Sequence, residues 1–166
     1  LTIRATDSWG RYAEQAVRVT VWETWTLVED FDHVGILPAE WGVTAGGSSG
    51  YPWQPVQSTG DGYMMKTMAT LGSTANERLV SRTFNLSAYE AIVVSYDTSF
   101  LRYGNGTGTF AYSLDNVTYT SIETLNQPTE GVRSFNLTAL TGRPNVRFRW
   151  TYYNSQANTG QSNHWT

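Results

Sequence analysis

Three carboxylates stand within four residues near the start of the chain, and they are its strongest sign of metal chemistry. Ca²⁺ takes about six to eight oxygen ligands, many of them from carboxylates, so a dense acidic run suits this ion. The sequence therefore predicts a candidate calcium site at Glu29, Asp30 and Asp32, with Ca²⁺ as its cofactor. The alternative is an acidic strand edge that faces water and binds nothing.

Aromatic side chains close to turns form a second candidate site, for sugars. An aromatic ring offers an apolar face on which a sugar can stack, and amides hydrogen-bond the hydroxyls. The candidate ligand-binding residues are Tyr51, Trp53, Tyr63, Tyr103, Tyr153 and Asn154. Tyr153 is the best exposed of them, because it falls in the opposite pleat phase to Trp150 and Tyr152. The alternative, a place in the core, is the more common outcome for a tryptophan such as Trp53.

Catalytic patterns are nearly absent. The chain has no cysteine, which excludes disulfides, zinc thiolates and cysteine nucleophiles. Its two histidines, His33 and His164, accompany no nucleophile-elbow motif. The spacing of the acidic residues selects no glycosidase pair. The glycine-rich run at 46–50 lacks the lysine and the following helix of a phosphate loop, so we expect a flexible loop and no enzymatic activity.

Four Asn-x-Ser/Thr sequons begin at Asn85, Asn105, Asn116 and Asn136. They matter only if the source organism glycosylates its exported proteins. Asn105 and Asn116 fall in predicted turns, so they are the candidate glycosylation sites.

The overall composition and charge argue against some classes of binding partner. Among 166 residues the net charge is −3, the pI is about 5.3 and only 15% of residues are charged. The basic residues are scattered along the sequence, which argues against a nucleic-acid partner. No apolar run reaches the length of about 18 residues that a membrane helix needs, and no signal peptide is visible.

Strand periodicity dominates the chain. Residues 146–153, VRFRWTYY, alternate so that Val146, Phe148, Trp150 and Tyr152 share one face. In 91–97, Ile92, Val94 and Tyr96 face inward in the same way. Residues 107–124 read as a hairpin that turns at Asp115-Asn116. Further strands are expected at 25–31, 41–45, 53–57, 62–68, 77–84 and 131–137. The pattern predicts an all-β jelly-roll sandwich preceded by an extra hairpin.

The first 22 residues form that extra hairpin. LTIRATDSWG, which ends in a turn at residues 8–10, and the closing VRVTV resemble the last hairpin of an immunoglobulin-like or cadherin-like repeat. A lone hairpin is marginally stable in water. We therefore expect it to pack on another domain of a longer chain or on a neighbouring subunit, with residues 23–26 as a linker.

Residues 27–166 resemble the cleaved-adhesin or choice-of-anchor jelly-roll domains, whose architecture is MAM-like. The opening VEDFDHVGILPAEWGVT carries the acidic-Phe-acidic strand and the Leu-Pro-x-x-Trp segment of these domains. Residues 78–100, RLVSRTFNLSAYEAIVVSYDTSF, match their middle phrase. Residues 113–119 match their Ser-x-Asp-Gly hairpin, with Asn116 in place of Gly, and RFRWTYYNSQANTGQSNHWT is similar to their penultimate strand and loop. The resemblance also implies calcium near the first strand.

One short sequence motif, called the repeated phrase below, occurs twice, as TFNLSAY from residue 83 and as SFNLTAL from residue 134. In a jelly roll, each copy would end one strand, turn, and deliver the next strand to the opposite sheet. We expect the aromatic residue of each phrase to enter the core with the leucine beneath the corner. The residues are Phe84, Leu86, Phe135 and Leu137.

The similar domains continue beyond their final Trp into an Ile-Asp-Asn-Val strand, so the 27–166 sandwich is expected to lack its last strand. Truncation of a longer chain is one explanation, and strand donation by the hairpin of a neighbouring subunit is the other. We predict a non-enzymatic, extracellular or cell-surface structural or adhesive module, self-associating or joined to neighbouring domains. The alternative is a glycan-binding module of a secreted enzyme.

Overall fold

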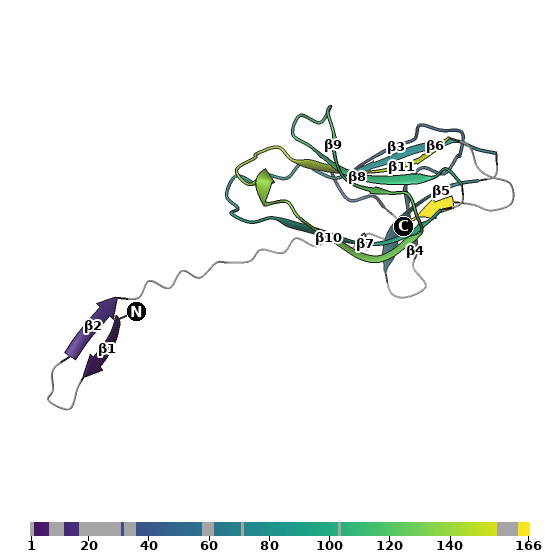
Figure 1. Ribbon diagram of the computed structural model, residues 1–166. Helices are drawn as coiled ribbons and strands as arrows, with labels where there is room; N and C mark the ends of the chain where they lie inside the picture. Colours follow the sequence, from purple (N-terminus) through teal and green to yellow (C-terminus); the bar gives the residue numbers. More distant parts are fainter. Residues whose placement is uncertain are drawn as a thin grey trace.

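The structure of the protein is a computed structural model, and the residues that it describes are 2–6, 12–16, 31, 36–57, 62–70, 72–102, 104–155 and 163–166. Its described residues form twelve strands and one short 3₁₀ helix, Thr138–Leu140. Two antiparallel five-stranded sheets lie face to face as a sandwich, shown one above the other in Figure 1. The predicted all-β sandwich is confirmed. No helix in the described part of the chain is long and apolar enough to cross a membrane.

The first sheet has the strand order β10-β7-β12-β5-β4. Its bounds are β10 Thr129–Asn136, β7 Val93–Leu101, β12 Asn163–Trp165, β5 Tyr63–Ala69 and β4 Gln54–Gln57. The predicted alternation at 91–97 is confirmed, because Ile92, Val94 and Tyr96 are at least partly buried while Ser95 and Asp97 are exposed. The strand at 163–165 was not predicted, because three residues are too few to show a period.

The second sheet has the strand order β3-β6-β11-β8-β9. Its bounds are β3 Gly42–Thr44, β6 Ala75–Val80, β11 Arg147–Asn154, β8 Thr107–Ser113 and β9 Thr120–Leu125. The predicted pleat phase of β11 is confirmed, since Phe148 and Tyr152 are buried and Tyr153 is exposed. The strand predicted at 77–84 ends earlier, at Val80, and Phe84 forms an isolated bridge with Val146 instead.

The N-terminal hairpin is present as an antiparallel pair, β1 Thr2–Thr6 and β2 Tyr12–Ala16. Its register runs from Thr2 opposite Ala16 to Thr6 opposite Tyr12. The second strand therefore begins earlier than the apolar alternation near residues 17–21 suggested. Those residues, the predicted turn at 8–10 and the linker at 23–26 lie outside the described part of the chain.

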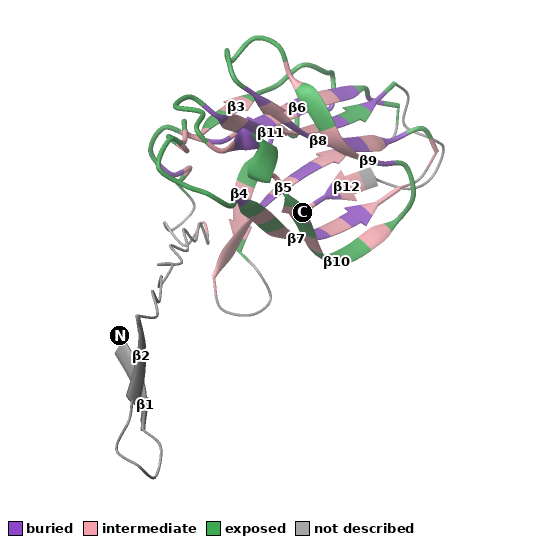
Figure 2. Cartoon of the chain, turned by 60° about the vertical axis from the view of Figure 1, so that its left-hand side comes forward, coloured by how far each residue is buried: buried purple, intermediate pink, exposed green. Residues whose placement is uncertain are grey.

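Aromatic packing joins the two sheets in two adjoining clusters. Figure 2 marks the buried positions along the strands. One cluster centres on Trp53, Phe100 and Trp165. The other centres on Phe110, whose ring stacks on Trp150 with centroids 5.0 Å apart. Offset and edge-to-face ring pairs of this kind add to the stabilisation from area burial.

The repeated phrase forms two matching corners, as predicted. Phe84, Leu86, Phe135 and Leu137 all pack against the second cluster. One phrase leads from β6 in the second sheet to β7 in the first, and the other leads from β10 in the first sheet to β11 in the second. In each, the asparagine side chain accepts a backbone N–H two residues on, at 3.1 Å for Asn85 and 3.0 Å for Asn136. This Asx turn reverses the chain between sheets.

Candidate functional site

The predicted calcium ligands Glu29, Asp30 and Asp32 lie outside the described residues, so their geometry stays a prediction. Phe31, which stands among them, is partly buried and packs edge-on against Trp41 at 5.1 Å. No group of three acidic, histidine or cysteine side chains gathers elsewhere in the described residues.

Sequence reasoning did not single out Glu77 as a site residue, yet it is a charged side chain inside the core and is only 1% exposed. One carboxylate oxygen, Oε1, accepts the Ser49 hydroxyl at 3.0 Å. The other, Oε2, has no hydrogen-bond partner within the described part of the chain. Because an isolated buried carboxylate is costly, this half-satisfied group marks the interior near Ser49 as unusual. The sequence pattern that could have identified Glu77 is a charged residue at a position of the strand that faces the core.

The glycine-rich run at 46–50 is not a free loop, contrary to prediction. The Ser48 backbone N–H donates to the Thr74 hydroxyl at 3.2 Å, and the Ser48 hydroxyl accepts the Thr74 N–H at 3.0 Å. A Cβ at Gly47 would stand 2.3 Å from the Thr74 carbonyl oxygen. The glycines are needed because backbone packs directly on backbone there.

The described members of the predicted sugar-binding set are spread over the core and both sheets. Trp53 is 4% exposed and donates its indole N–H to the Glu77 carbonyl oxygen, and Asn154 is fully buried. Neither can contact a ligand at the surface. Tyr63 is half-buried in the first sheet, whereas Tyr153 is 47% exposed on β11 of the second. Tyr51 is 39% exposed in the segment before β4, and Tyr103 lies outside the described residues.

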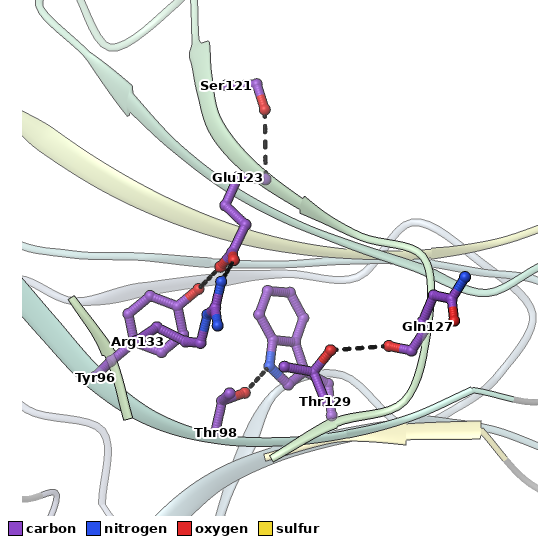
Figure 3. Close-up of polar contacts among 8 residues, drawn as sticks. Tyr96, Thr98, Ser121, Glu123, Gln127, Thr129 and Arg133 are labelled. Atoms are coloured by element: carbon purple, nitrogen blue, oxygen red, sulfur yellow. Dashed lines mark hydrogen bonds and ion pairs between the residues drawn. The ribbon is translucent and has the colours of Figure 1, made fainter. Parts of the chain in front are cut away.

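A partly buried polar clamp ties the margins of the two sheets together, as Figure 3 shows. The Tyr96 hydroxyl of β7 donates to Glu123 Oε2 at 2.9 Å, and Arg133 of β10 pairs with Glu123 Oε1 of β9. Burial, followed by the hydrogen bond to Glu123 and its negative charge, raises the pKa of Tyr96 far above its ordinary value. The phenol therefore stays protonated, and the clamp is structural rather than reactive.

The short strand β12 is fixed deep between its neighbours. Trp165 is 1% exposed, stands opposite Thr67 and Phe100, and donates its indole N–H to the Thr98 hydroxyl at 2.6 Å. Thr166 and Ser99 exchange backbone hydrogen bonds of 2.8 and 2.9 Å. The final residues thus form the centre of a sheet.

Next to β12, the register defines a stretch between β5 and β7 that we call the slot. Residues 64–66 of β5 and 93–98 of β7 flank it. No strand in the described part of the chain lies between those two segments. Two core positions, Met65 and Thr98, line its inner side and are 5% and 4% exposed.

The loop between β8 and β9 is organised around Asp115. Its Oδ1 accepts the Val117 and Thr118 N–H groups at 2.8 and 2.7 Å and the Ser113 hydroxyl at 3.0 Å. These hydrogen bonds lower the pKa of Asp115 to about 2. Asn116 has φ 60°, a left-handed conformation that asparagine tolerates better than most residues.

Next to this loop, the outer face of the second sheet carries a groove of about 350 Å³. Three guanidinium groups line it, from Arg78 on β6 and from Arg147 and Arg149 on β11. Tyr119 closes one side, and the Arg149 guanidinium lies 3.6 Å from the centre of its ring. Burial, with a smaller effect of the Arg78 charge, lowers the pKa of Arg149. Sequence reasoning noted only scattered arginines, because strand pairing brings these together.

Of the two histidines, His33 lies outside the described residues. His164 is half-buried on β12, and burial, with a smaller effect of the Lys66 charge, lowers its pKa. No described hydrogen bond joins it to a serine or a carboxylate. The candidate glycosylation sites Asn105 and Asn116 are both exposed, and Asn116 Oδ1 accepts the Tyr119 hydroxyl at 3.0 Å.

Comparison with solved structures places this fold beside cleaved adhesin domains. The K1 cleaved adhesin domain of Lys-gingipain from Porphyromonas gingivalis W83 superposes with a TM-score of 0.59 at 14% identity, over 82% of this chain and 90% of that one. The K3 domain of the same protein gives 0.55 at 13% identity, over 83% and 94%. No protein-family model and no curated protein sequence matches the chain.

Proposed function

We propose that this chain is a non-enzymatic adhesive β-sandwich module that works outside the cell or at its surface. The observation that carries the proposal is the fold shared with two domains described as cleaved adhesins. Two further features support it. The pKa perturbations of Tyr96 and His164 arise where side chains are buried, not where a nucleophile stands beside a base. The polar clamp and the aromatic clusters are suited to a rigid scaffold.

The test is adhesion of cells that display the chain. The chain is expressed on the surface of a non-adherent bacterial strain, and retention under flow is measured on matrix proteins, mucin and glycan-coated glass. Retention above that of a strain displaying an unrelated β-sandwich supports the proposal. Absence of retention on every surface, or turnover of a hydrolase substrate by the purified chain, refutes it.

Strand donation is the finer form of this proposal. The slot past β12 would accept a strand antiparallel to both β5 and β7, with alternate side chains against Met65 and Thr98. The N-terminal strand has the matching alternation, with Leu1, Ile3 and Ala5 apolar. A donated β1 from a second copy would satisfy backbone groups on both sides. Because donor and acceptor differ, such contacts propagate as a filament.

Among the described strands, β12 alone lies between β5 and β7 in this sheet, so the slot matches the width of one strand. A closed hairpin therefore cannot enter, and β1 must leave β2 to be donated. Ala5 stands opposite Ala13, so a disulfide between Ala5→Cys and Ala13→Cys would lock the hairpin shut. Oxidised protein should stay monomeric at concentrations where the reduced form makes filaments in negative-stain micrographs. Equal assembly in both forms, or none in either, rules out donation of β1.

A glycan-binding module of a secreted enzyme is the second candidate, favoured by the exposed ring of Tyr153 on the outer sheet face. Neutral and acidic glycan arrays test it, with Tyr153→Ala as the variant and Tyr89→Ala, at an exposed tyrosine outside the candidate set, as the matched control. Loss of a specific neutral-glycan signal in Tyr153→Ala alone would favour this candidate over the adhesive one.

Calcium binding at Glu29, Asp30 and Asp32 is also proposed, supported by their acidic spacing. An ion that binds only the folded state must stabilise it. EDTA should therefore lower the melting temperature and added Ca²⁺ restore it, with Mg²⁺ as the control ion. An unchanged melting temperature in Ca²⁺ and in EDTA counts against the site.

A further inference from the structure

The arginine groove, defined by Arg78, Arg147 and Arg149, concentrates positive charge on an otherwise acidic protein. The whole chain has 11 Lys and Arg residues against 14 Asp and Glu, so three guanidiniums in one groove are not a general basic surface. All three come from one face of the second sheet, where Arg149 stands opposite Val80, two residues from Arg78. The groove is therefore fixed by the sheet register.

No acidic side chain among the described residues forms an ion pair with these guanidiniums. Within the described part of the chain, the one ion pair joins Arg133 to Glu123, away from the groove. The Nε atoms of Arg78 and Arg149 are buried and lack a hydrogen-bond partner among the described residues. Arg147 Nε donates to the neutral Thr83 hydroxyl at 2.7 Å. Like charges held close together repel one another, so three guanidiniums with no described counter-charge favour the binding of an anion.

Nearby groups position the cations without cancelling them. Tyr119 holds the Arg149 guanidinium over its ring face and is itself held by the bond from its hydroxyl to Asn116. Asp115 lines an adjoining groove of about 280 Å³ together with Arg147. Its Oδ1 is occupied by the loop N–H groups and the Ser113 hydroxyl, and the structure shows no ion pair between Asp115 and Arg147.

The spacing indicates how many anionic groups the ligand carries. Residues two apart on a strand, such as Arg147 and Arg149, are separated by about 6.6 Å. Diagonal cross-strand neighbours, such as Arg149 and Arg78, are separated by about 7–8 Å. A row of cations at these intervals suits a polymer with repeated anionic groups better than a single small ion. Guanidinium groups bind oxyanions with paired hydrogen bonds, which fits sulfate or carboxylate.

We propose that the arginine groove binds an acidic saccharide through its sulfate or carboxylate groups. Asn116 and Thr44, which also line the groove, offer hydrogen bonds to sugar hydroxyls. A single-stranded nucleic acid fits less well, because it needs free aromatic faces for its bases and the Tyr119 face is covered by Arg149. The inference deepens the proposed adhesive function by giving it a ligand class, and it rests on that function only for its biological setting.

The test is a titration of the whole chain with four labelled octamers. They are a heparin fragment carrying sulfate, an oligogalacturonate carrying carboxylate, neutral maltooctaose and oligothymidylate. One of the two acidic saccharides should bind tightest, and its affinity should fall as salt rises from about 0.05 M to about 0.3 M. Which of the two binds tighter identifies the anionic group. Tighter binding of oligothymidylate or maltooctaose overturns the proposal, as does absence of binding to both acidic saccharides at the lower salt.

Substitutions of single arginines test whether the saccharide binds in the arginine groove. Arg78→Gln and Arg147→Gln should each weaken binding about tenfold, the equivalent of one charge-assisted hydrogen bond. Arg143→Gln removes an exposed arginine that does not line the groove and should change affinity less than twofold. Equal loss in all three variants would show only a general charge effect and would overturn the assignment.

Gly42 allows a test that keeps every arginine. It lines the groove on β3, and a Cβ built on it meets nothing within 4 Å. Gly42→Glu would place a carboxylate among the cations, while Gly42→Gln adds the same bulk without charge. Binding should fall at least tenfold in Gly42→Glu and stay within about threefold in Gly42→Gln, with unchanged circular dichroism. Similar affinities for the two overturn the proposal.

The groove and the adhesive function can fail separately. If the octamers bind and the variants behave as expected, but displayed cells adhere to no surface, then the groove stands and the adhesive function falls. If displayed cells adhere equally well with Arg147→Gln and with Gly42→Glu, then adhesion stands and the groove is not its ligand site.

Discussion

Trp165 should be among the most costly side chains to remove, because it fixes β12 at the centre of the first sheet. It is 1% exposed and packs edge-on against Trp53 and Phe100, with ring centroids 5.4 and 5.8 Å away. Truncating a fully buried tryptophan to alanine costs about 3–5 kcal/mol. The hydrogen bond to Thr98 adds about 1 kcal/mol. A domain of this size is stable by only about 5–15 kcal/mol, so Trp165→Ala would remove a large part of the free energy of unfolding.

A milder change makes the effect measurable. Trp165→Phe keeps one ring and loses the indole N–H, so we expect a loss of about 2 kcal/mol. The free energy of unfolding would be measured by urea titration with circular dichroism, and the slope against urea should not change. Tyr153→Ala, on an exposed ring, is the control and should stay within about 0.5 kcal/mol. A loss below about 0.5 kcal/mol for Trp165→Phe would show that β12 does not occupy the sheet.

Gly108 gives an independent check on the same packing. A Cβ there would stand 3.0 Å from the Trp165 ring, so Gly108→Ala should cost about 1–3 kcal/mol by overpacking. The smaller ring of Trp165→Phe would relieve that contact, so the double variant should be more stable than the sum of the single losses by at least about 0.5 kcal/mol. Strict additivity would mean that the two side chains do not touch.

Other perturbations probe separate parts of the fold. Tyr96→Phe removes the hydroxyl that reaches Glu123 and should cost about 1 kcal/mol by urea titration, whereas no loss would show that the clamp is not formed. Burial lowers the pKa of His164 below 6.5, so the unfolded chain binds the proton more tightly and stability should fall as the pH drops below about 6.5. His164→Gln should flatten that dependence in melting curves from pH 5 to 8, and an equal slope in both proteins would contradict it. Gly47→Ala should cost at least about 2 kcal/mol, because its Cβ would collide with backbone, and a neutral effect would show that the loop is free after all.

The inward and outward faces of the long strands could be predicted because each strand carries its own alternation of apolar and polar residues. In 146–153 an apolar residue at every second position meets the core, and the structure buries Phe148 and Tyr152 as that pattern requires. The repeated phrase was equally informative, since Phe84 and Phe135 needed only their neighbours in sequence to mark a corner between sheets.

Predictions of sites that relied only on local sequence spacing agreed less well with the structure. The aromatic candidates were chosen for lying near turns, yet Trp53 is in the core and Tyr63 and Tyr153 belong to different sheets. The glycine-rich run at 46–50 was predicted to be flexible because its composition is flexible. Its contact with the segment around Thr74 depends on a backbone that lies beside it only after folding.

The sequence by itself therefore determined the all-β fold class, the inward and outward faces of the strands, and the corners between the sheets. These follow from a two-residue period that each segment carries alone. The tertiary structure decided which distant segments became neighbours. Arg78 meets Arg149 only because β6 pairs with β11 in one register, and a slip of one residue would put these side chains on opposite faces. Cross-strand register is a property of the whole sandwich, set when its core closes, and no local period contains it.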